Sequence, residues 1–142
     1  MPRSTTITAR RLLSPLRYAW ALPTTAIGLC LGAPALLTRR GGMQWVDGVL
    51  EFHGGFVEFF LAECTLLPGG ASAMTLGHVV LGRDRASLEW TRAHERVHVR
   101  QCERWGPLFL PAYGVASVLA WWRGSDAYMG NWFEREAYAV AP

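Results

Sequence analysis

The sequence contains no lysine, so arginine carries all of its positive charge. The 142 residues include 14 arginines and 11 acidic residues, which gives a net charge of +3. Part of this charge belongs to the N-terminus and not to a face built for nucleic acid, and no nucleic-acid-binding motif is present. We therefore expect no nucleic-acid partner. The N-terminal arginines are Arg3, Arg10, Arg11 and Arg17.

Cysteine is also scarce. Cys30, Cys64 and Cys102 are far apart in the sequence and form no CxxC pair, which excludes a disulfide-rich scaffold and a cysteine zinc knuckle. Cys64 and Cys102 could pair in an oxidising compartment, although a small buried thiol is the commoner outcome. A chain of this length forms one domain, or a small domain with an appended segment.

Charge is missing altogether from residues 18–38, between Arg17 and the Arg39-Arg40 pair. A helix needs about 20 apolar residues to cross a bilayer. The segment is therefore predicted to be a transmembrane anchor, with a signal peptide as the alternative. Prolines and glycines within it weaken the helix.

The arginines around this segment predict its orientation. More of them precede it than follow it, which favours a cytoplasmic N-terminus and places the remainder on the periplasmic side of a bacterial inner membrane. We accordingly divide the chain into a basic, hydrophobic N-terminal segment, residues 1–40, and a domain of residues 41–142.

Turn signals predict short strands in the first half of this domain. Asp47-Gly48 lies between two β-prone runs and predicts a hairpin over residues 43–55. Residues 56–70 fit a helix or a strand, because periodicity does not separate the two. Residues 72–82 are rich in apolar and β-branched side chains and are predicted to form one strand.

Cap signals predict helices in the second half. A helix over residues 88–105 follows a cap at Asp84 or Ser87 and ends before Gly106-Pro107. Residues 107–122 are uncharged and apolar all round, which fits a buried core helix or a membrane helix. A last helix follows Asn131, a good N-cap.

The helix over residues 88–105 carries the chemical signal His94-Glu95-Arg96-Val97-His98. Two histidines spaced by four residues lie on one helix face, where both imidazoles can bind one metal ion. Glu95 is the residue that sites of this kind use to take a proton from water. The pattern predicts a Zn²⁺ site with Glu95 as general base.

A zinc site of this type needs a third protein ligand. No histidine follows at the spacing HExxHxxGxxH, because Gln101 and Arg104 occupy the positions of that glycine and last histidine. The candidates are Glu134 and Glu136 in the last helix, and two histidines with one glutamate form a known catalytic set. Glu103 points away from the ligand face.

The stretch HERVHVRQCERWG, together with TLGHVVLGRD before it and NWFEREAY after it, resembles a family of small bacterial zincin-like metallopeptidases. The resemblance covers residues 74–138 and implies an α+β, zincin-like minimal domain: an HExxH helix, a small sheet or hairpin, and a C-terminal helix that supplies a glutamate. FEREAY is also similar to the FExxAD block of membrane metallopeptidases that process prenylated proteins. That similarity favours Glu134 as third ligand, while Tyr138 replaces the aspartate of the block.

Other polar residues have more than one interpretation. Gln101, His78 and Asn131 are candidates for orienting or alternative ligands, although His78 fits a structural role and Asn131 a helix cap equally well. The tyrosines Tyr113, Tyr128 and Tyr138 could stabilise an oxyanion or simply pack. The arginines Arg92, Arg96 and Arg100 recur every four residues and are predicted to form a solvated helix face.

The expected function is a membrane-associated zinc metallopeptidase in which residues 73–82 pair along an edge with an extended peptide or protein substrate. The alternative is a catalytically silent subunit that contacts partner subunits of a larger membrane complex and lipid. The small size of residues 41–142 motivates this alternative. A third interpretation, a chance HExxH in an α+β domain, is opposed by the paired motif NWFEREAY.

Overall fold

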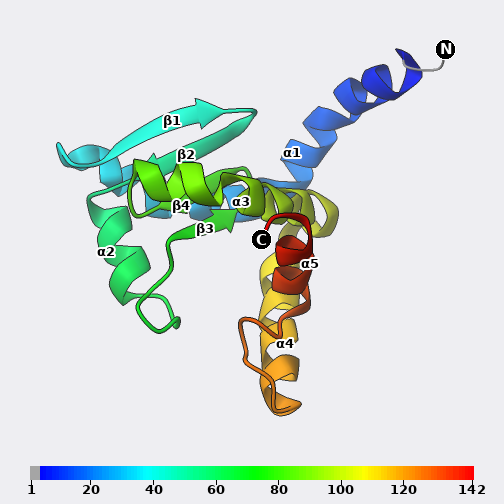
Figure 1. Ribbon diagram of the computed structural model, residues 1–142. Helices are drawn as coiled ribbons and strands as arrows, with labels where there is room; N and C mark the ends of the chain where they lie inside the picture. Colours follow the sequence, from blue (N-terminus) through cyan, green and yellow to red (C-terminus); the bar gives the residue numbers. More distant parts are fainter. Residues whose placement is uncertain (1–3) are drawn as a thin grey trace.

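The computed structural model describes residues 4–142 and contains a mixed four-stranded sheet (Figure 1). Its strands are ordered β1-β2-β4-β3, so β1 and β3 form the edges. The pairs β1–β2 and β3–β4 are antiparallel, whereas β2 and β4 are parallel. The strands are β1 (Gly42–Val46), β2 (Val49–His53), β3 (Ala73–Leu76) and β4 (Val79–Gly82).

Helices pack on both faces of the sheet, and because two of its three strand pairs are antiparallel hairpins the fold is α+β, as predicted. Figure 1 shows α3 across one face and the second half of α1 behind the other. Both α4 and the first half of α1 extend away from the sheet. The helices are α1 (Ser4–Gly32), α2 (Phe56–Glu63), α3 (Arg85–Trp105), α4 (Phe109–Trp122) and α5 (Trp132–Val140), with 3₁₀ turns η1 (Ala33–Leu37) and η2 (Gly106–Leu108).

Side chains of successive strand residues point to opposite faces of the sheet. Val80 of β4 packs with Leu88 and Val99 of α3 on one face. The neighbouring Val79 and Leu81 point to the other face, into the larger core beneath α1 and α2. Period-two alternation in β4 therefore buries both of its faces, as expected for a central strand.

One segment of the described chain, Ser14–Leu37, is long and apolar enough to cross a membrane by length and composition. Signal sequences and core helices share these properties. Of the segment's most apolar window, 28 % is buried. The division of the chain at residue 40 stays a prediction.

The second half of α1 nevertheless packs directly on the sheet. A Cβ atom at Gly28 would lie 2.7 Å from the Cβ atom of Val79, so only glycine allows this approach. Leu31 and the buried Ala35 extend the contact into the core beneath the sheet. The glycines that weaken a free helix here serve close packing.

The prediction of one strand over residues 72–82 is wrong. The segment is a hairpin in which β3 and β4 pair antiparallel around a turn at Gly77-His78. Gly77 has φ +67°, a left-handed conformation that favours glycine. Apolar residues lie on both sides of this turn, so only Gly77 and His78 interrupt the apolar run.

Several element predictions are confirmed. The Asp47-Gly48 hairpin forms, with positive φ at both residues. Asp84 caps α3, since its carboxylate accepts a hydrogen bond from the Ser87 amide. The undecided residues 56–70 begin with a helix, α2.

The apolar helix α4 is not a buried core helix. Only Phe109 and Ala120 are buried along it. Val115, Val118, Trp121 and Trp122 are all exposed. The membrane interpretation of this helix stays a prediction. Cys64 and Cys102 do not pair: both are free, the first exposed and the second buried.

Candidate metal centre

Three side chains from two helices converge beside the sheet. His94 and His98 project from one face of α3, and Glu134 from the first turn of α5. The Nε2 atoms of the histidines are 3.2 Å apart. The Glu134 carboxylate lies 3.2 Å from His94 Nε2 and 3.4 Å from His98 Nε2. Two ligand atoms of a tetrahedral zinc ion are about 3.3 Å apart, so the spacing fits one ion.

Hydrogen bonds at the far side of each imidazole favour the tautomer that a metal requires. His94 Nδ1 donates to the backbone carbonyl of Ala141 at 3.2 Å. His98 Nδ1 lies 2.8 Å from Gln101 Oε1, which accepts because the Gln101 amide nitrogen donates elsewhere. With Nδ1 protonated in both neutral rings, two Nε2 lone pairs meet at one point. A cation is the group that this arrangement fits.

The structure separates the two candidate glutamates. Glu134 is buried against both histidines. Glu136 instead accepts a hydrogen bond from the Gln101 amide at 2.8 Å and lies 3.4 Å from Arg104. Glu136 therefore orients Gln101, which in turn orients His98. The group of His94, His98 and Glu134 could hold a metal ion.

Electrostatics keep the Glu134 carboxyl ionised. Burial alone would raise its pKa, but in the metal-free protein hydrogen bonds from protonated His94 and His98 and from Tyr113 outweigh burial and lower the pKa to about 2. Tyr113 donates to Glu134 Oε1 at 2.6 Å. Burial and the neighbouring Glu134 raise the pKa of Tyr113, so the phenol stays a donor. An ionised carboxylate is the form that binds a metal.

Glu95 lies next to this cluster but faces the sheet. Its Oε2 accepts a hydrogen bond of 2.6 Å from Thr75 of β3. Burial, the largest influence, raises the pKa of Glu95 above its usual range. A raised pKa suits a carboxyl that must take up and release a proton near neutral pH. Sequence reasoning missed Thr75, because nothing in the strand pattern marks it as a partner of Glu95.

Two residues considered as orienting or alternative ligands have no contact with the cluster. His78 lies in the β3–β4 turn, where its Nε2 is 2.9 Å from Glu103 and its ring stacks on Tyr18. Asn131 caps α5 through Phe133 N and donates to the Tyr113 carbonyl. His78 belongs to a structural contact, and Asn131 joins α5 to α4. Glu103 points away from the ligand face, as predicted.

The arginine face predicted to be solvated is partly buried. Arg92 and Arg96 reach Glu51 of β2, whose side chain is only 1 % exposed. Burial opposes ionisation of Glu51, but hydrogen bonds and charges of these arginines outweigh it and lower its pKa. Only Arg100 is exposed as predicted. The prediction failed because the spacing of arginines does not reveal a carboxylate in a distant strand.

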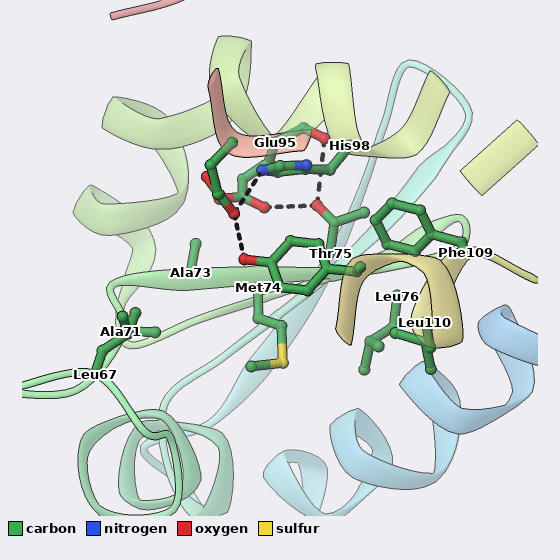
Figure 2. A pocket seen from close by; sticks show the side chains of 12 residues that line it. Leu67, Ala71, Ala73, Met74, Thr75, Leu76, Glu95, His98, Phe109 and Leu110 are labelled. Atoms are coloured by element: carbon green, nitrogen blue, oxygen red, sulfur yellow. Dashed lines mark hydrogen bonds and ion pairs between the residues drawn. The ribbon is translucent and has the colours of Figure 1, made fainter. Parts of the chain in front are cut away.

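A cavity of about 230 Å³ opens beside His98, Glu95 and Glu134. Figure 2 shows His98 and Glu95 at one end of it, with Met74, Leu76 and Leu110 toward the other. All four residues of the edge strand β3, Ala73–Leu76, line the cavity. The candidate centre thus faces a space large enough for a side chain of another molecule.

Comparison with models of known protein families found no match, and comparisons with curated proteins and with solved structures found none either. The resemblance to zincin-like metallopeptidases therefore rests on the motifs alone.

Proposed function

We propose that the protein is a membrane-associated zinc metallopeptidase with His94, His98 and Glu134 as metal ligands. The observation that carries the proposal is the convergence of two Nε2 atoms and one ionised carboxylate at tetrahedral spacing. Two imidazoles and one carboxylate suit zinc and other divalent first-row metals. The choice of zinc follows from the HExxH pattern.

The residues around the cluster supply the rest of the mechanism. A zinc ion held by His94, His98 and Glu134 would acidify water and polarise a carbonyl group. Glu95 accepts the proton of the attacking water, and Thr75 holds the Glu95 carboxylate in place. Gln101 and the Ala141 carbonyl fix the orientations of the two imidazoles.

An extended peptide is the substrate that suits the surroundings. β3 has a strand neighbour, β4, on one side only, and its outer edge runs along the cavity. An extended peptide can pair with such an edge through its backbone. This would place a peptide bond beside Glu95 and His98.

Membrane association is proposed from the N-terminal segment and α4. The segment is apolar enough to cross a bilayer, and α4 exposes Trp121 and Trp122 near Arg123. Aromatic residues next to arginine are common at membrane interfaces. We assign the protein to a bacterial inner membrane, with residues 41–142 on the periplasmic side.

A second candidate function is a catalytically silent subunit of a membrane complex. The exposed apolar side chains of α4 support it, because such a surface is covered in many assemblies. In this case the zincin-like domain binds a partner and hydrolyses nothing.

Metal analysis of the purified full-length protein separates these functions. We expect about one zinc per chain, and none in a His94→Ala/His98→Ala variant that remains folded. Glu95→Gln should keep the metal and lose hydrolysis. Folded protein that takes up no zinc would exclude the peptidase. Zinc with unchanged hydrolysis in Glu95→Gln would exclude Glu95 as the base.

A further inference from the structure

A larger groove adjoins the cavity at the candidate metal centre. This groove, of about 720 Å³, lies between α2 with its following loop and α4 with the loop after it. Cavity and groove share three lining residues, Leu67, Met74 and Tyr113. The two spaces are therefore adjacent, and together they are called the cleft; its metal end is lined by β3, His98 and Glu134.

The lining of this cleft is apolar away from the metal end. No arginine lines either part, and the chain has no lysine. The charged side chain in the groove lining is Asp126, whose Oδ1 already accepts hydrogen bonds from the amides of Tyr128 and Met129. An acidic side chain entering here would lose water without gaining a counter-ion, which is costly. The lining thus selects against acidic ligands.

The size of the cavity sets the size of the side chain that it can hold. An apolar cavity of about 150 Å³ is enough to take up benzene. The volume here is about 230 Å³, so a side chain as large as that of Leu or Phe fits. Leu66 and Met129, both exposed, extend the apolar lining to the outer part of the groove.

We propose that the cleft binds an extended apolar segment of a peptide, paired with the edge of β3 and with a Leu- or Phe-sized side chain in the cavity. Cleavage of the bound segment rests on the proposed function. Binding does not, because it needs no hydrolysis. Continuity of the cleft with His98 and Glu134 is the reason to choose a peptide as occupant. A backbone on β3 places one side chain in the cavity and alternate ones on the same side.

Binding can be measured without turnover. The probe is a set of short fluorescent peptides rich in Ser and Asn that differ only in a central Leu, Phe, Ala or Asp. They are titrated by fluorescence anisotropy into full-length Glu95→Gln protein in lipid nanodiscs, with empty nanodiscs as blank, because detergent could itself fill an apolar cleft. We expect Leu and Phe peptides to bind at least about tenfold more tightly than the Ala and Asp peptides.

A pair of matched variants locates the binding. Leu110 lines the cavity, whereas Leu108, two positions earlier, is exposed and lines neither the cavity nor the groove. Leu110→Ala enlarges the cavity and should raise the affinity ratio of Phe to Leu peptides, while Leu108→Ala should leave it unchanged. A ratio within one variant does not depend on the fraction of folded protein.

The outcomes separate the two proposals. Equal affinity for all four peptides, or an equal change of the ratio in both variants, would overturn the cleft assignment. Selective binding by protein whose wild-type form hydrolyses none of these peptides would overturn the peptidase and keep the cleft. Hydrolysis of all four peptides at the same rate would overturn the cleft assignment and keep the peptidase.

Discussion

Two buried carboxylates contact opposite faces of α3, and each meets a pair of basic residues one helical turn apart. Glu51 of β2 meets Arg92 and Arg96. Glu134 of α5 meets His94 and His98. The spacing of the basic residues and the burial of the carboxylates are nearly the same on both faces, so the difference in chemistry comes from the basic residues.

Arginine and histidine differ in what they can do when a carboxylate is near. The guanidinium group stays protonated and has no lone pair for a metal, so the Glu51 face is a fixed ion pair that ties α3 to the sheet. Imidazole can lose its proton and offer a lone pair, so the Glu134 face can exchange protons for a metal ion. One helix therefore carries a structural face and a chemical face.

The largest expected effect comes from breaking the structural face. Glu51→Ala removes the buried carboxylate from two half-buried arginines, of which Arg96 keeps only its hydrogen bond to the Val46 carbonyl, and breaking a buried pair costs about 3–5 kcal/mol. Chemical denaturation of the metal-free protein should show this loss in the free energy of unfolding. Glu63→Ala, at an exposed position, should change it little. Equal effects of both variants would show that the Glu51 contacts do not stabilise the fold.

The corresponding substitution on the chemical face, Glu134→Ala, should lower the affinity for zinc. Glu134→Ala removes one ligand of three, and we expect zinc affinity to fall by more than the roughly 10- to 100-fold that is typical of losing an orienting contact. In the metal-free protein, Glu134→Ala should lower the free energy of unfolding less than Glu51→Ala does, because histidines left unpaired can lose their protons. Competition with a chromogenic chelator measures the affinity. Unchanged affinity would exclude Glu134 as ligand, and Glu136→Ala is the comparison.

As the pH falls, the chemical face should lose its metal before the structural face loses its ion pairs. The hydrogen bond with Glu134 raises the pKa of metal-free His94, and that of His98 is raised although burial opposes it. Protonation therefore competes with zinc already near neutral pH. The pKa of Glu51 is lowered in the fold, so its stabilisation is present above the unfolded value of about 4.3 and is lost only as the pH falls through the folded value.

Zinc content and intrinsic fluorescence followed on the same samples from pH 8 downward test this order. We expect zinc to dissociate between about pH 7 and 6, and unfolding to begin only below about pH 4.5. Zinc release that coincides with unfolding would mean that the metal, and not the Glu51 contacts, holds α3 in place.

Local signals in the sequence were sufficient to predict α3 and the two histidines of the candidate site. Asp84 caps the helix through a residue three positions away, and the spacing of His94 and His98 sets their common face. These features depend on neighbours in the sequence. Glu134 lies far along the chain, and a resemblance between motifs, not periodicity, pointed to it.

Contacts between distant elements could not be predicted in the same way. Glu51 is 41 positions from Arg92, and Thr75 is 20 positions from Glu95. Which side of a helix packs on a sheet decides such contacts, and the regular recurrence of arginine suggests a solvated face equally well. The hairpin at Gly77-His78 was missed because apolar residues continue on both sides of the turn.

The smallest expected effect concerns the residue that joins the chemical face to the rest of α5. Gln101 accepts from His98 and donates to Glu136 and to the Phe133 carbonyl, so it fixes the imidazole without touching a metal. Gln101→Ala should lower zinc affinity by about 10- to 100-fold, the range for an orienting contact. Its neighbour Arg100 is exposed, and Arg100→Ala should leave the affinity unchanged. Glu136→Gln leaves Gln101 an acceptor and should cost less than Gln101→Ala. If Gln101→Ala binds zinc as tightly as wild type, packing alone orients His98. The two faces of α3 would then differ only in carrying arginines or histidines opposite the carboxylate.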